Sequence, residues 1–253
     1  MIVLIRYLSV LFLSTVFSCS DQAPSANNEN IELKGLWPLA ISDPSGLSLH
    51  PDGESIWVVS DNPGRPVYRI DLRGNRIGTI PFDGEDLEGI AWDARDNTLW
   101  LVEERRREVI HMDTTGRILK RKELEIVQQV ENDGLEGIAV NPANGHIFVI
   151  NEKNPRIFIE LTPELDIIKI TPVDFEGKNT VTDISGLFFD PDSSEIWILS
   201  DESQKIVITD AELNPLRSFD LLVDKAEGLT VDTHRRLIYV VSDSESILYV
   251  YAY

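Results

Sequence analysis

The chain has 253 residues, enough for one globular core or one closed repeat architecture. Hydrophobic residues make up 42% of it, as in globular proteins, but 43 acidic side chains outnumber 23 basic ones and the formal net charge is −20. Such a surface repels nucleic acids and anionic lipid headgroups and favours cations, so we expect no nucleic-acid partner.

The first 18 residues have the pattern of a secretory signal peptide. Arg6 is the single charge, and the apolar stretch over residues 8–17 is shorter than the ~20 residues that span a bilayer. Ser18 directly precedes the only cysteine, Cys19, and a small residue in this place resembles the lipobox of bacterial lipoproteins. The resemblance implies cleavage before Cys19 and lipidation of its thiol; ordinary signal cleavage with a free thiol is the alternative.

Residues 19–30 are small and polar after the cysteine, which predicts a flexible tether between the lipid and a domain over residues 31–253. With Cys19 lipidated, no thiol remains for a disulfide, a thiolate metal site or a cysteine nucleophile. Ser20, rather than Asp, follows the cysteine, which by analogy with lipoprotein sorting favours the outer membrane over the inner membrane. We therefore expect a membrane-anchored protein of the bacterial cell envelope whose domain faces the periplasm or the exterior.

A repeated unit of roughly 45 residues fills the rest of the chain and is the strongest pattern in the sequence. Five glycines, spaced by 43, 48, 49 and 42 residues, mark the units: Gly46, Gly89, Gly137, Gly186 and Gly228. An aromatic side chain lies 11 residues after each glycine: Trp57, Trp100, Phe148, Trp197 and Tyr239. An acid lies 15 residues after each glycine: Asp61, Glu104, Glu152, Asp201 and Asp243.

Each unit has the pattern of four antiparallel strands joined by turns rich in Pro, Asp, Asn and Gly. The fifth unit stops at Tyr253 after its third strand, whereas residues 31–39 supply a spare strand before the first glycine. The sequence therefore predicts an all-β fold, a five-bladed β-propeller that the N-terminal strand closes, because closure removes exposed strand edges. A six-bladed ring is the alternative, and solenoids are set aside because their repeats are shorter.

The repeat also predicts where the acids lie. The first two strands of a unit are antiparallel neighbours, so the residue before each glycine and the acid 15 residues after it share one end of the blade. Around a ring, these ends form one mouth of the central channel. The inner circle is Ser45, Glu88, Glu136, Ser185 and Glu227, and the outer circle is the five acids named above. Four further acids approach from the preceding loops: Asp43, Asp86, Asp133 and Asp183.

Carboxylates held close together raise one another's pKa unless a cation sits among them, and ligands that are all oxygen suit Ca²⁺. We therefore predict a Ca²⁺ site, or a site for a cationic ligand group, with these candidate ligands: Glu88, Glu136, Glu227, Asp61, Glu104, Glu152, Asp201 and Asp243. Two alternatives stay open. The acids and serines can hydrogen-bond to neighbouring backbone amides and join blade to blade, or the mouth can be a substrate site.

The starts and ends of the units resemble the SdiA-regulated family of bacterial envelope proteins. The starts read D-L-E-G-I-A, G-L-E-G-I-A and K-A-E-G-L-T, and the ends read I-W-V-V-S-D and L-I-Y-V-V-S-D, within residues 35–253. The resemblance implies a five-bladed propeller, attachment to a membrane and no established activity, and it supplies no catalytic residues. Family members typically have a hydrophobic N-terminal anchor, and the lipobox-like Cys19 departs from that pattern.

Two classes of function fit these features. One is a non-catalytic binding or scaffold module, expected to be monomeric, whose partner is an envelope protein or a small cationic ligand. The other is a Ca²⁺-dependent hydrolase of phosphoesters or lactones. At the acidic mouth only Ser45 and Ser185 interrupt the acids, and neither has a histidine near it in the sequence. A phosphate site would also need Lys and Arg there. The sequence therefore favours binding.

Overall fold

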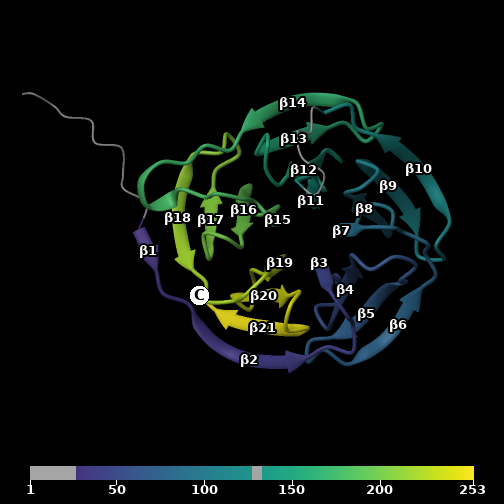
Figure 1. The fold of residues 1–253 in the computed structure, drawn as a ribbon, viewed down its shortest axis with the longest axis horizontal. Helices are drawn as coiled ribbons and strands as arrows, with labels where there is room; N and C mark the ends of the chain where they lie inside the picture. Colours follow the sequence, from purple (N-terminus) through teal and green to yellow (C-terminus); the bar gives the residue numbers. More distant parts are fainter. Residues whose placement is uncertain (1–26, 127–132) are drawn as a thin grey trace, which may run out of the picture.

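The computed structural model describes residues 27–126 and 133–253. These residues form five sheets around a central axis (Figure 1), so the predicted five-bladed β-propeller is confirmed and the six-bladed alternative is wrong. The predicted signal peptide, Cys19 and most of the expected tether lie outside the described residues. Within the described ranges, no helix has the length and apolar character needed to cross a membrane.

Each blade has four antiparallel strands that follow one another outward from the axis. The first contains β3 (Pro44–Leu49), β4 (Ser55–Ser60), β5 (Val67–Asp71) and β6 (Arg76–Ile80). The second contains β7 (Leu87–Asp93), β8 (Thr98–Glu103), β9 (Glu108–Asp113) and β10 (Ile118–Glu123). The third contains β11 (Leu135–Val140), β12 (Ile147–Asn151), β13 (Ile157–Leu161) and β14 (Ile167–Pro172). A short 3₁₀ helix, Gly177–Asn179, follows β14.

The last two blades include the N-terminal segment. The fourth contains β15 (Gly186–Asp190), β16 (Glu195–Ser200), β17 (Lys205–Thr209) and β18 (Pro215–Asp220). The fifth contains β19 (Ala226–Asp232), β20 (Leu237–Ser242) and β21 (Ile247–Ala252), and its outer strand is β2 (Glu32–Pro38). Because β2 pairs antiparallel with β21, with Leu36 opposite Tyr249, the predicted closure by the N-terminal strand is confirmed.

A second N-terminal strand lies where the sequence predicts a tether. Strand β1 (Asn27–Glu29) pairs in parallel with β18, on the outer edge of the fourth blade (Figure 1). The N-terminal segment thus crosses from the edge of the fourth blade to the edge of the fifth. This placement joins two neighbouring blades through one continuous stretch of chain.

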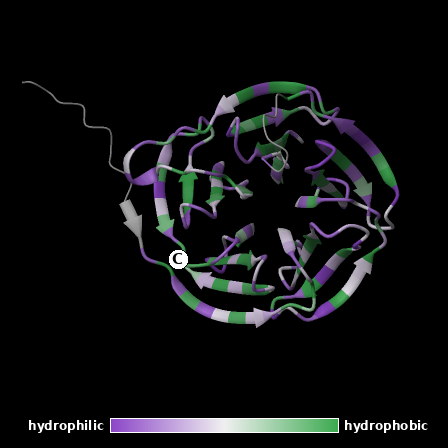
Figure 2. Ribbon diagram, in the orientation of Figure 1, coloured by the Kyte–Doolittle hydropathy of each residue, from purple (hydrophilic) through white to green (hydrophobic). Residues whose placement is uncertain are grey.

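The aromatic residue of each unit fills the space between its own blade and the next. Trp100 and Trp197 are 1% exposed, and each packs in a cluster with inner-strand residues of the following blade. Trp57, Phe148 and Tyr239 occupy the matching places in the other three clusters. Burying an aromatic side chain contributes about 1.5–3 kcal/mol, so these five contacts hold the ring together. The outer strands instead mix polar and apolar residues (Figure 2), because one of their faces meets solvent.

The glycine of each unit lies at the closest approach between neighbouring inner strands. A Cβ added to Gly89 would come within 2.3 Å of the Glu136 carbonyl oxygen, and one added to Gly228 would come within 2.2 Å of the Ser45 carbonyl oxygen. Gly46 meets the backbone of the second blade in the same way. A side chain at any of these positions would therefore push two blades apart at the axis, where the ring is narrowest.

Candidate functional site

In four of the five blades, a backbone hydrogen bond holds the acid that follows the second strand beside the start of the first strand of the same blade. The Glu104 amide donates to the Asp86 carbonyl oxygen at 3.0 Å, and the Glu152 amide donates to the Gly134 carbonyl oxygen at 2.7 Å. Matching bonds place Asp61 and Asp243 in the first and fifth blades. The two predicted circles of acids thus meet at one mouth, because the first two strands of a blade run in opposite directions.

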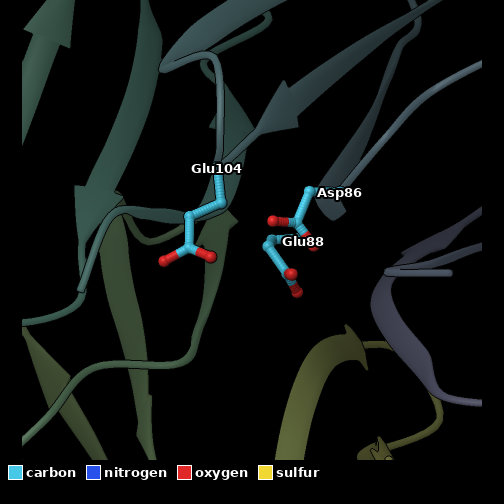
Figure 3. A group of neighbouring side chains, drawn as sticks. All are labelled: Asp86, Glu88 and Glu104. Carbon is cyan, nitrogen blue, oxygen red and sulfur yellow. The ribbon is translucent and has the colours of Figure 1, made fainter. Parts of the chain in front are cut away.

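Two groups of carboxylates converge within this mouth. Oxygen atoms of Asp86, Glu88 and Glu104 lie within 4.8 Å of one another, and so do those of Glu104, Glu136 and Glu152. Figure 3 shows the first group, in which Asp86 and Glu88 approach each other and Glu104 comes from a separate strand end. Glu104 belongs to both groups, so it connects the second and third blades.

Four of the eight predicted ligands do not join these groups. Asp61, Asp201, Glu227 and Asp243 lie at the same mouth, but among the described residues they form no three-residue carboxylate cluster. Asp86, by contrast, comes from the loop before β7 and joins the first group. From the sequence, Asp86 could be assigned only to a loop near the mouth, because a loop lacks the fixed register that relates two paired strands.

Some acids and serines at the mouth form hydrogen bonds that join neighbouring blades, which is one of the alternatives left open by the sequence. Glu104 Oε1 accepts a bond from the Gly134 amide at 2.8 Å, and Asp201 Oδ1 accepts one from the Ala226 amide at 3.1 Å. Ser45 donates to the Glu88 carboxylate at 2.7 Å, and Ser185 donates to the Ala226 carbonyl at 2.7 Å. Each of these bonds links one blade to the next. Glu104 and Asp201 therefore help to join the blades as well as adding negative charge.

The Glu136 carboxylate forms no hydrogen bond of this kind between blades among the described residues. Its side chain is 7% exposed, and within the described residues neither a hydrogen bond nor an ion pair reaches its carboxylate. Burial raises its pKa well above the ordinary value, and the charges of Glu88 and Glu227 add to the rise. A buried carboxyl group without a partner is costly unless it is protonated or beside a cation.

The same physical cause acts on the surrounding acids. Burial, with a contribution from the charge of Asp201, raises the pKa of Glu227 to about 8. Burial raises the pKa of Glu104 to about 7 and, together with the charge of Asp243, raises that of Asp61 to about 6. Near neutral pH the mouth therefore holds several protons when no cation is bound, and a bound cation would displace them.

Three basic side chains, which the sequence analysis did not place, border the mouth. Arg105 lies 3.3 Å from Asp86, Lys153 lies 2.7 Å from Glu152, and Lys225 lies 3.7 Å from Asp201. Lys153 also reaches Glu202 at 2.9 Å. The sequence did carry a signal, since Arg105 and Lys153 directly follow the repeated acid. All three cations form ion pairs with acids other than Glu88 and Glu136, so these two inner carboxylates have no basic partner among the described residues.

The fold and this site define a class of protein: a closed five-bladed β-propeller with carboxylates gathered at one axial mouth. The chain belongs to the SdiA-regulated family, whose model matches residues 26–251. That range includes both N-terminal strands and all five blades.

Solved structures share the fold at low sequence identity. The glutaminyl cyclase of Myxococcus xanthus has a TM-score of 0.72 and 13% identity, with 90% of this chain and 97% of that chain covered. The virginiamycin B lyase of Staphylococcus aureus has a TM-score of 0.52 and 15% identity, covering 84% and 67%. A protein of unknown function from Bacteroides caccae has a TM-score of 0.55 and 12% identity, covering 78% and 69%. At these identities the likeness shows the fold alone.

Proposed function

We propose that this protein is a membrane-anchored binding module that holds a hard divalent cation, Ca²⁺, among the carboxylates of its acidic mouth. The observation that carries the proposal is the pair of carboxylate groups that share Glu104. One of them includes the buried Glu136, which has no partner in the part of the chain that the structure describes. Bound there, the ion would compensate charge that the described protein residues leave uncompensated.

The spacing and chemistry of the donors fit Ca²⁺. This ion binds oxygen at about 2.3–2.6 Å, so two ligand atoms on one ion lie at most about 5 Å apart. The oxygen atoms of each carboxylate group lie within 4.8 Å of one another, which meets that limit. Every member is a carboxylate, with no nitrogen or sulfur donor, and such a set suits Ca²⁺ better than softer metals. Water would supply the remaining ligands of the ion.

Calorimetric titration of the chelator-stripped protein with Ca²⁺ tests this proposal. We expect saturable binding in the wild type and its loss in Glu136→Gln, which removes one charge and keeps the side-chain shape. Glu164→Gln is the matched control, because Glu164 is exposed on the loop between β13 and β14. Absence of both heat and any shift in melting temperature in the wild type would rule out the metal site.

A role in binding rather than catalysis agrees with the pairing of the basic groups at the mouth. Arg105, Lys153 and Lys225 all contact acids, which leaves them poorly placed to hold a phosphate. Two of the structurally similar proteins are enzymes by name, but a shared fold does not transfer an activity. A screen of phosphoesters and lactones with added Ca²⁺ checks this assignment. Saturable turnover that Glu136→Gln abolishes would replace it with a Ca²⁺-dependent hydrolase.

The anchor and the location belong to the same proposal. We infer that lipid on Cys19 attaches the protein to a bacterial envelope membrane, with the outer membrane favoured by Ser20. The propeller would then present its mouth, as a monomer, to an envelope protein or a small cationic ligand. Cys19→Ser should move the protein from the membrane fraction to the soluble fraction and abolish labelling by a palmitate analogue. Unchanged fractionation of this variant would contradict the lipid anchor. A pull-down from envelope extracts would identify a protein partner.

A further inference from the structure

The second mouth of the propeller holds a cavity that the acidic site does not use. Five aliphatic side chains, each directly after the glycine of its unit, meet near the axis and are at most 5% exposed: Leu47, Ile90, Ile138, Leu187 and Leu229. They leave only about 10 Å³ of space in the channel at their level. Beyond them, the opposite mouth opens into a cavity of about 420 Å³. The two mouths are therefore separate sites.

Most of the polar residues around this second mouth are bonded within their own turns; His234, which also borders the cavity, is exposed to solvent. Four residues after each glycine, a polar side chain accepts a bond from a backbone amide of the turn that follows. The accepting residues are His50, Asp93, Asn141, Asp190 and Asp232. Asp93 and Asp232 also pair with Arg95 and Arg235. The next position along each unit, which borders the cavity, is uncharged in every blade: Pro51, Ala94, Pro142, Pro191 and Thr233. In a chain of net charge −20, this mouth thus presents an apolar surface.

Two aromatic side chains interrupt the repeat at the cavity wall. Trp92 stands where the first, third and fifth units have Leu49, Val140 and Val231 and the fourth has the buried Phe189. Phe188 stands where the other units have small residues. Both are partly exposed, unlike the aromatic residues of the core. The ring of His50 lies 4.6 Å from that of Trp92, and the Trp57 ring stacks behind Trp92 at 6.2 Å, so the indole is held in place.

From this geometry we propose that the second mouth is a binding site for a small, uncharged aromatic molecule. The cavity volume falls within the range of about 300–1,000 Å³ typical of small-molecule sites. The aliphatic floor supplies apolar contact, and Trp92, His50 and Phe188 offer ring surfaces for stacking or edge contact. A charged ligand would lose hydration against a floor of aliphatic side chains, and the acids Asp93 and Asp232 near the rim already pair with Arg95 and Arg235, so the site favours uncharged molecules. This proposal is independent of the cation site.

Indole is a suitable probe, because it is small, aromatic and uncharged. The full chain, labelled with 5-fluorotryptophan, gives one fluorine resonance for each of its 5 tryptophans, and Trp92→Phe assigns the signal of Trp92. We expect indole to shift the Trp92 signal with half-saturation at about 1 mM or below, the affinity that a ligand of this size can reach. The signals of Trp37 on the outer edge and of the buried Trp100 should stay in place.

Two variants and a second probe make the test specific. Val140→Phe should weaken binding on the order of tenfold by filling the cavity. Phe189 at the matching position of the fourth blade shows that the repeat accepts this side chain. Glu164→Gln, on the exposed loop between β13 and β14, should leave indole binding unchanged. Indole-3-acetate, which is anionic, should bind more weakly than indole. The proposal would be overturned if indole did not shift the Trp92 signal, if it shifted all tryptophan signals equally, or if Val140→Phe bound indole with unchanged affinity.

Discussion

Single glycines determine how closely the blades approach the axis. At Gly89, a methyl group would lie 2.3 Å from a backbone oxygen and 2.7 Å from Val102. The backbone oxygen cannot move away without shifting a strand, and the Val102 methyl group is itself buried in the core. At Gly78, on the outer strand β6, the nearest atom to an added Cβ is Arg69 Cβ at 3.8 Å, which is ordinary contact.

We therefore expect Gly89→Ala to destabilise the protein by about 3 kcal/mol, at the upper end of overpacking effects. Gly78→Ala is the matched control and should be neutral or stabilising by up to about 1 kcal/mol, because it restricts the unfolded chain. Urea denaturation of both variants gives the two free energies of unfolding. Equal stability of the two variants would show that the inner strands do not limit the ring.

The buried carboxyl groups predict how stability depends on pH. The pKa of Glu227 rises from 4.5 to about 8 on folding, and that of Glu104 rises from 4.5 to about 7. The folded state therefore binds more protons than the unfolded state between these values. Stability of the Ca²⁺-free protein should be greatest below pH 4.5, as far as these two groups are concerned, and should fall as the pH rises to about 8.

Urea denaturation of chelator-treated protein at pH 5.5 and pH 8 measures this effect, and we expect the lower stability at pH 8. Glu227→Gln should reduce the difference, because glutamine stays uncharged at both pH values. Saturating Ca²⁺ should also reduce it by stabilising the ionised carboxylates. An equal pH dependence in wild type and Glu227→Gln would contradict it.

At the scale of elements, strand β2 closes the ring. It pairs with β21 over Glu32 to Pro38, and Trp37 packs against the hydrophobic cluster between the fifth and first blades. The shorter strand β1 adds only three residue pairs to the edge of the fourth blade. Loss of β2 would leave the fifth blade with three strands and expose the edge of β21, whereas loss of β1 would leave the fourth blade with its four strands.

Deleting residues 32–38 should therefore lower the melting temperature strongly and expose β21 to proteolysis. Deletion of residues 27–29 is the control and should have a small effect, since β18 completes the fourth blade without β1. Circular dichroism with limited proteolysis compares the two deletions. Equal behaviour of the two would show that closure by β2 contributes little to stability.

For the whole molecule, a cation at the acidic mouth would stabilise the closed ring, because the two carboxylate groups come from the neighbouring second and third blades. A ligand at a hundredfold excess over its dissociation constant stabilises the folded state by about 2.7 kcal/mol. For a protein of this size, 1 kcal/mol changes the melting temperature by about 2–4 °C. We therefore expect Ca²⁺ to raise the melting temperature by about 5–10 °C.

Differential scanning calorimetry with Ca²⁺ or with a chelator measures this rise. Glu136→Gln should abolish most of it, whereas Glu164→Gln should retain it. Magnesium should be less effective, since it keeps its bound water and prefers smaller, more regular sites. An equal rise with both ions and in both variants would indicate a general charge effect on the surface rather than a site.

Much of the molecule is predictable because the repeat relates residues at fixed separations. Gly89, Trp100 and Glu104 occupy equivalent places in their unit, so each has four counterparts that support the same interpretation. The repeat did not predict the cavity at the second mouth, because its aromatic wall residues Trp92 and Phe188 depart from the repeat. Arg105, Lys153 and Lys225 were missed at the first mouth because they occur in only some units.

The sequence by itself determined the number of blades, their closure by the N-terminal strand and the gathering of acids at one mouth, since all three follow from strand order and spacing. The tertiary structure decided which acids meet. Glu136 is buried with no hydrogen bond or ion pair to its carboxylate among the described residues, whereas Glu104 and Asp201 accept bonds from the next blade. The physical reason is that contacts between blades depend on side-chain direction and the narrow axis, and spacing along one chain encodes neither.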